Sequence, residues 1–126
     1  MLAEWRVANP DLELVLVRGN HDRRAGDPPA EAGVRCVDAP MRDGPFLLAH
    51  HPAVSDDGYV LAGHLHPGVQ LIGRGRMRER LPCFWFAARG GVLPAFGDFT
   101  GLADVTPEPG DRVYAVTAAE VVEVHA

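Results

Sequence analysis

Residues 12–22 read LELVLVRGNHD and join an apolar run to a polar loop. The run Leu12–Val17 is almost continuously apolar, which is typical of a strand buried on both faces of a sheet. The loop Arg18–Asp22 follows the carboxyl end of that strand, which is where open α/β sheets bind their ligands. The stretch therefore predicts an α/β fold with a functional site at one edge of a sheet.

Two more apolar runs end in histidine. Residues 46–49 lead into two adjacent histidines, and residues 59–62 lead into a His-Leu-His motif. The side chains that could carry chemistry after the three runs are Asn20, His21, Asp22, His50, His51, His64 and His66. If the three strands are parallel neighbours, these side chains meet at one edge, and imidazole with oxygen donors suits Zn, Mn, Fe or Ni. The pattern predicts a metal site, whereas the isolated His125 is expected to be an ordinary surface or core residue.

The rest of the chain predicts short elements separated by turns, since 14 glycines and 11 prolines occur in 126 residues. A helix is expected over Met1–Ala8 and a loop over Arg23–Ala32. Further strands are expected at Val34–Val37, Val69–Ile72, Arg76–Arg80, Cys83–Ala87, Arg112–Thr117 and Glu120–Val124. No linker divides the chain, so residues 1–126 are interpreted as a single domain.

Composition excludes several classes of protein. The net charge of −5 argues against a protein that coats nucleic acid non-specifically. Cys36 and Cys83 are too few for a disulfide framework, so reduced, buried or half-buried thiols are expected. The chain has no apolar run long enough to span a bilayer and no signal peptide, so we expect no membrane contact and a cytoplasmic location.

Arginines alternate at positions 74, 76, 78 and 80. A strand would place all four on one face, where they could grip a phosphate backbone. The alternative, which we favour slightly, is a solvated strand face, because Glu79 interrupts the series and the chain is acidic. Trp85 and Phe86 are expected to belong to the core rather than to stack on bases.

Three motifs together resemble a known family. Residues 19–22 (GNHD), 50–52 (HHP) and 63–66 (GHLH) resemble, in order, the last three signature blocks of calcineurin-like metallophosphoesterases. Residues 81–86 (LPCFWF) and 93–101 (LPAFGDFTG) resemble one branch, the DNA ligase-associated metallophosphoesterases, endonucleases of a bacterial DNA damage response. The resemblance implies a metallophosphoesterase-type β-sandwich flanked by helices and a hydrolase that cuts phosphodiester substrates, DNA among them, in DNA repair.

The resemblance also implies roles for individual residues. Asn20, His50 and His64 would bind one divalent ion (Mn, Zn or Fe), with His51 as the alternative to His50, and His66 would bind a second ion. His21 would lie beside the scissile phosphate, where it would donate a proton to the leaving oxygen or stabilise charge. Asp22 would hold the His21 ring.

The chain departs from the family at its beginning. The family's Asp-x-His and Gly-Asp blocks do not precede Gly19, and the Gly97-Asp98 pair lies too late to replace them. We therefore expect an N-terminally truncated domain, with the N-terminal half missing, that binds one metal at most and associates through an uncovered sheet edge. Two functions follow from this: a metal-dependent phosphodiesterase or nuclease, or a catalytically incompetent fragment or decayed homologue. For this chain alone, little or no activity is expected.

Overall fold

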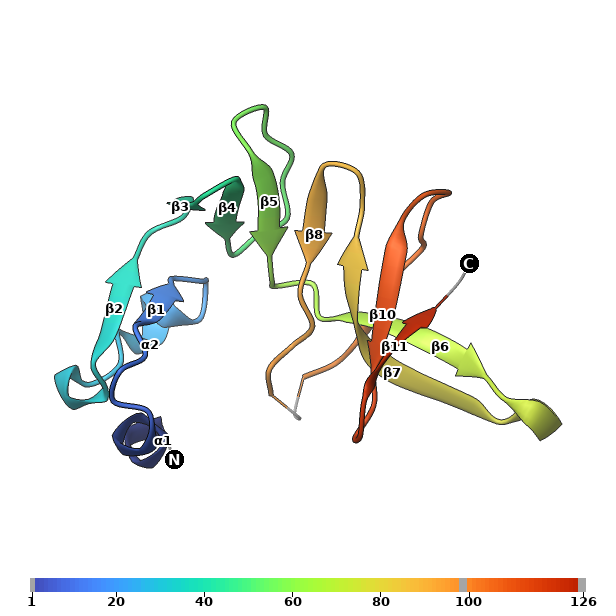
Figure 1. Ribbon diagram of the computed structural model, residues 1–126, viewed down its shortest axis with the longest axis horizontal. Helices are drawn as coiled ribbons and strands as arrows, with labels where there is room; N and C mark the ends of the chain where they lie inside the picture. Colours follow the sequence, from blue (N-terminus) through green and yellow to red (C-terminus); the bar gives the residue numbers. More distant parts are fainter. Residues whose placement is uncertain (1, 98–99, 125–126) are drawn as a thin grey trace.

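The computed structural model describes residues 2–97 and 100–124, so the expectations placed on Met1, Asp98 and His125 lie outside the described residues. It shows a mixed α/β protein dominated by strands, with few helices (Figure 1). The helical elements are α1 (Leu2–Ala8), α2 (Asp22–Ala25), η1 (Ala30–Ala32) and η2 (Arg74–Arg76). The strands are β1 (Leu14–Val17), β2 (Val34–Val37), β3 (Met41–Asp43), β4 (Phe46–Ala49), β5 (Tyr59–Ala62), β6 (Pro67–Ile72), β7 (Arg78–Phe86), β8 (Gly90–Val92), β9 (Ala103–Asp104), β10 (Arg112–Val116) and β11 (Val121–Val124).

The strands form two sheets. β1 and β2 pair in parallel as a small two-stranded sheet, and the remaining strands form a nine-stranded sheet. Its main path runs in the order β11-β10-β7-β8-β5-β4-β3, while β6 pairs with β7 and β9. The strands predicted at residues 34–37, 46–49 and 59–62 are confirmed with the same bounds.

Three short parallel strands, β4, β5 and β8, form the part of the large sheet that positions the histidines. Leu47 on β4 packs with Val60 and Ala62 on β5, and all three are buried. Parallel strands run between covered faces and tend to be apolar, as these are. Because β4 and β5 are parallel and in register, the loops after Ala49 and Ala62 leave the sheet at the same edge.

The small sheet differs from its prediction. All four residues of β1 are half-buried, so the expectation of a strand buried on both faces is wrong. The physical reason is that β1 pairs only with β2 among the described strands and stands outside the large sheet. The predicted loop at residues 23–32 also contains helical turns, α2 at its start and η1 at its end.

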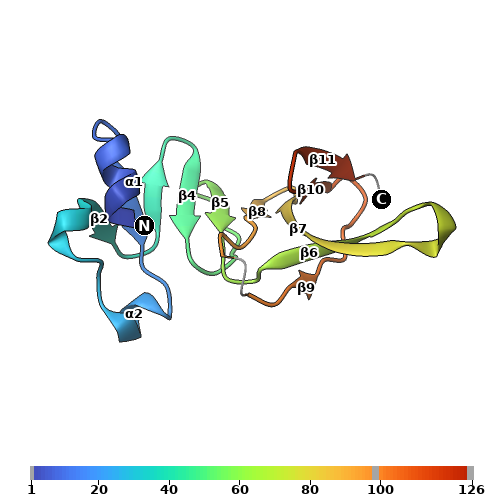
Figure 2. The ribbon, with the colours of Figure 1, turned by 90° about the horizontal axis from the view of Figure 1, so that it is seen from below.

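β6 and β7 form a hairpin that projects from the far side of the large sheet (Figures 1 and 2). The four alternating arginines do not share one strand face, and the strand expected at residues 76–80 begins later, at Arg78. Residues 74–76 form a 3₁₀ turn in which Gly75 and Arg76 have positive φ, and only Arg78 and Arg80 lie on β7.

The other side-chain predictions can be checked directly. Cys36 is half-buried and Cys83 is buried, and both are free thiols, as expected. Trp85 and Phe86 are half-buried, and the Trp85 indole N–H donates to Asp111 at 2.8 Å, which favours a role in packing over base stacking. No helix in the described part of the chain is long and apolar enough to cross a bilayer.

Candidate metal centre

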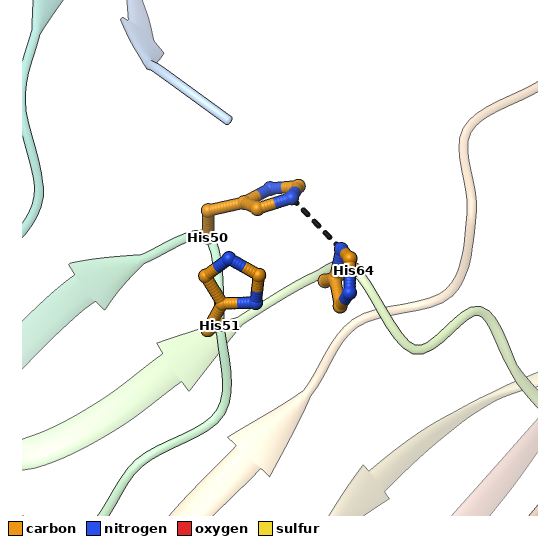
Figure 3. Close-up of side chains that lie close together, drawn as sticks. All are labelled: His50, His51 and His64. Carbon is orange, nitrogen blue, oxygen red and sulfur yellow. Dashed lines mark hydrogen bonds between the residues drawn. The ribbon is translucent and has the colours of Figure 1, made fainter. Parts of the chain in front are cut away.

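Three histidines converge where β4 and β5 end. His50 and His51 follow β4, and His64 follows β5 after a single glycine. One ligand atom from each ring lies within 4.8 Å of the others, and the rings surround a common space (Figure 3). The ring centroids of His51 and His64 are 4.3 Å apart, and those of His50 and His64 are 4.7 Å apart. The parallel register of the two strands therefore produces the cluster that the sequence predicted.

Asn20 joins this cluster from the other sheet. Its Oδ1 lies 2.7 Å from Nε2 of His50, and Nδ1 of His64 lies 2.9 Å from the same nitrogen (Figure 3 shows the His50–His64 contact). β1 is not a neighbour of β4 in a sheet, so the convergence comes from the loop after β1 and not from strand pairing. The structure thus brings together Asn20, His50 and His64, with His51 beside them.

Gly19 makes this approach sterically feasible. A Cβ atom built on Gly19 would lie 2.6 Å from Cε1 and Nδ1 of His50, closer than such atoms approach in real proteins. Gly19 itself is buried beneath the ring. A side chain at position 19 would therefore force the His50 ring or the loop to shift.

The loop after β1 is held by several polar contacts. The Asp22 carboxylate accepts the backbone N–H of Gly19 at 2.7 Å, which closes the turn that presents Asn20. Arg18 binds both carboxylate oxygens of Asp27 at 2.8 Å, and Asp27 raises the pKa of the guanidinium. These contacts fix the loop from both of its ends.

His21 and Asp22 lie at the start of α2. His21 is exposed, and its carbonyl accepts the backbone N–H of Ala25 at 2.9 Å. The carboxylate of Asp22 is engaged with Gly19, and its predicted contact with the His21 ring stays a prediction. Both residues are near enough to His50 to influence its pKa.

The backbone turns sharply around Leu65. His64 has a φ of 66° and His66 a φ of 50°, in the left-handed region that non-glycine residues seldom adopt. Such conformations cluster at functional sites, where the surrounding structure enforces them. His66 is half-buried and is not part of the three-histidine group among the described residues, so its predicted role as a ligand of a second ion is not tested by the geometry.

The electrostatics favour the neutral form of His50. Burial lowers the pKa of His50 below its usual value, and the neighbouring His64 and His51 lower it further, while Asp22 acts in the opposite direction. A lowered pKa means that the neutral ring, whose free nitrogen can bind a metal, persists to lower pH than in an ordinary histidine.

The donor set fits a transition-metal ion. Two donors in adjacent positions around an octahedral ion, each at about 2.1 Å, lie about 3 Å from one another. The separations of 2.7 Å and 2.9 Å around Nε2 of His50 are close to that value. Imidazole nitrogens with one amide oxygen suit Zn, Mn or Fe better than Mg or Ca. His51, the alternative that the sequence left open, lies within reach as a further donor.

A pocket of about 660 Å³ opens beside the histidine loops. Pro52 follows His51, Leu65 follows His64, and both residues line the pocket together with Trp85 and Arg89. The histidines themselves do not line it. The cluster therefore lies next to a partly apolar pocket, with His51 and His64 exposed.

Comparison with known proteins supports the fold. No protein-family model and no curated protein matches the chain. Among solved structures, the chain is similar to the crystal structure of the Pseudomonas putida nuclease MPE, with 42% sequence identity and a TM-score of 0.83. The match covers 98% of this chain and 59% of that chain, so the chain spans about three fifths of the length of that nuclease. The likeness supports a nuclease-like fold.

Proposed function

We propose that this chain belongs to the calcineurin-like metallophosphoesterases and provides the metal-binding part of a site that hydrolyses phosphodiester bonds in DNA. The observation that carries the proposal is the convergence of Asn20 Oδ1 and His64 Nδ1 on His50 Nε2 at 2.7 Å and 2.9 Å. The likeness to a protein named as a nuclease supports the choice of substrate class. In this proposal the two sheets are parts of a metallophosphoesterase-type β-sandwich. The enzyme would act in DNA repair.

The proposed ligands of one divalent ion are Asn20, His50 and His64, with His51 as an additional donor. An ion held there would supply Lewis-acid activation of a phosphoryl oxygen and lower the pKa of a water molecule. The lowered pKa of His50 favours the neutral ring, which is the form that binds a metal. His66 is proposed as a ligand of a second ion, which would be Mn, Zn or Fe.

His21 is proposed as the general acid. In hydrolysis, a water oxygen forms a new bond to phosphorus, and the bond from phosphorus to the leaving oxygen breaks. The leaving oxygen needs a proton, and an exposed imidazole next to Asn20 can supply it. Asp22 is proposed to position His21, because its carboxylate closes the turn that carries both Asn20 and His21.

The test uses the chain with Mn²⁺ and bis(p-nitrophenyl) phosphate, a small phosphodiester. His64→Ala is expected to abolish both metal binding and hydrolysis. On an oligonucleotide, whose alkoxide leaving group needs a proton, His21→Ala is expected to lower kcat by about 10²- to 10⁴-fold while the metal content stays unchanged. Equal hydrolysis by wild type and His64→Ala would show that the activity comes from a contaminant or from another site, and would end the proposal.

A second candidate is a module that binds one metal and hydrolyses nothing. The donor group supports this candidate, because the cluster found among the described residues contains three histidines and no carboxylate. Two-ion hydrolysis in the resembled family depends on a bridging carboxylate. Stoichiometric metal binding that is lost in His64→Ala, together with the absence of hydrolysis, would favour this candidate over the enzyme.

A further inference from the structure

The hairpin of β6 and β7 carries a concentration of positive charge that the metal site does not use. Within residues 67–82 there are four arginines and one glutamate, a net charge of +3, whereas the whole chain has a net charge of −5. All residues from 72 to 80 are exposed. We define the outer part of this hairpin, residues 72–80, as the arginine arm.

The arginines at the end of the arm lack carboxylate partners. Arg74, Arg76 and Arg78 form no ion pair with any residue that the structure describes. Five arginines are paired with a carboxylate (Arg18, Arg35, Arg80, Arg89 and Arg112), and those without such a pair among the described residues outside the arm are Arg6, Arg23, Arg24 and Arg42. Unpaired, exposed guanidinium groups grouped at one tip are free to bind phosphate oxygens.

The arm lies close to the histidine cluster in the sequence. β6 begins at Pro67, three residues after His64, and runs outward for six residues toward the turn at residues 74–76 (Figure 1). At the rise of a β-strand, six residues span about 20 Å. Figure 2 shows the same hairpin from another direction, again directed away from β4 and β5. A polyanion that contacts both the cluster and the arm must therefore be an extended chain with charges repeated along its length.

We propose that the arginine arm binds the phosphate backbone of a nucleic acid strand several nucleotides away from the bond cleaved at the histidine cluster. Arg80 is ion-paired with Asp104 at 2.8 Å and also donates to the carbonyl of Leu102, so it braces the base of the arm. The other three arginines supply the contacts to phosphate. The proposal rests on the proposed function for the location of the cleaved bond.

The first experiment measures binding without catalysis. Fluorescence anisotropy of a labelled 12-nucleotide oligothymidylate is recorded in the presence of a chelator, at salt concentrations from 50 to 200 mM. The variant carries Arg74→Gln, Arg76→Gln and Arg78→Gln. Each phosphate contact on a single strand contributes about 0.7 to the slope of log K against log salt, so the slope should fall by about 2. Affinity at 50 mM salt should fall by at least about 10-fold.

Matched variants separate the arm from charge in general. Arg35→Gln, Arg42→Gln and Arg112→Gln together remove the same charge from elsewhere on the surface, and this variant should keep the wild-type slope. Replacement of the three arm residues by lysine keeps the charge and should restore most of the binding. An unchanged slope in the arm variant, or an equal loss in the matched variant, would overturn the proposal. The proposal would also be overturned if the arm variant bound oligonucleotide as tightly as wild type and lost affinity only for anionic phospholipid vesicles.

Hydrolysis of bis(p-nitrophenyl) phosphate is measured in parallel as the readout of the histidine cluster alone. If the wild-type chain does not hydrolyse this ester, the proposed function fails while the binding titration still decides the role of the arm. If the ester is hydrolysed and the arm variant binds oligonucleotide as wild type does, the arm proposal fails while the proposed function stands.

Discussion

At the scale of single residues, the geometry of the cluster depends on one missing side chain. Gly19 lies against the His50 ring, and a Cβ atom there would come within 2.6 Å of two ring atoms. The ring must therefore move if Gly19 is replaced. The same ring carries Nε2, the atom that Asn20 and His64 both contact.

Gly19→Ala is expected to weaken metal binding by about 10- to 100-fold, the range typical of changes that misorient a ligand without removing it. Calorimetric titration with Mn²⁺ or Zn²⁺ measures the effect. Gly63→Ala is the matched control, because Gly63 precedes His64 and a Cβ added there has nothing within 4 Å. This variant should keep the metal affinity of the wild type. Equal losses of metal affinity in both variants would mean that the effect does not come from the contact of residue 19 with the His50 ring.

At the scale of elements, the pair β4 and β5 positions the histidines, and its stability comes from a small core. Leu47 is 9% exposed and Val60 is 3% exposed, and they pack across the two strands with Ala62. A cavity at Leu47 would loosen the register that brings His50 and His64 together.

Leu47→Ala is expected to lower the free energy of unfolding by about 2–5 kcal/mol, through lost burial and the cavity left behind. Urea denaturation followed by circular dichroism measures the change. Val54→Ala, at a side chain that is 63% exposed, should change stability by less than about 0.5 kcal/mol. A loss at Leu47 no larger than the loss at Val54 would contradict the assignment of the core.

The elements also show how far sequence reasoning can go. β2, β4 and β5 were predictable because each is a four-residue stretch next to glycine or proline, which is too short for a typical helix and favours a strand. Strands were predicted at residues 69–72 and 76–80 with a break between them, and the break extends through Arg76, because Gly75 and Arg76 both have positive φ. The glycines at 73 and 75 indicated the turn, but not that it continues through Arg76.

The site was predictable to the same degree. The histidines were found because each follows a strand, and parallel pairing of β4 with β5 then brings them together. The approach of the small sheet to the histidines was not predictable, since Asn20 reaches His50 through a loop and not through strand pairing. The contact of Gly19 with His50 depends on side-chain positions for which the sequence carries no signal.

At the scale of the whole molecule, the proposed metal site bridges two sheets. Asn20 follows β1 in the small sheet, while His50 and His64 follow strands of the large one. An ion bound by all three would tie the sheets together, and binding to the folded state alone stabilises it by about 2.7 kcal/mol at 100 times Kd.

Addition of Mn²⁺ or Zn²⁺ is expected to slow amide hydrogen exchange in β1 and β2, and a chelator should reverse the effect. Mass spectrometry of peptic fragments measures it. In Asn20→Ala the protection should disappear from β1 and β2 while the loops after β4 and β5 keep part of theirs. Protection of β4 and β5 alone in the wild type would mean that Asn20 does not take part in binding.

The chain contains two tryptophans, and they lie in different parts of the fold. Trp5 lies on α1, which contacts η1 beside the small sheet, while Trp85 lies on β7 with its indole fixed by Asp111. Each indole is a built-in fluorophore for one half of the molecule. With one of them replaced by phenylalanine, intrinsic emission would report separately on the loosening of each sheet, without any attached dye.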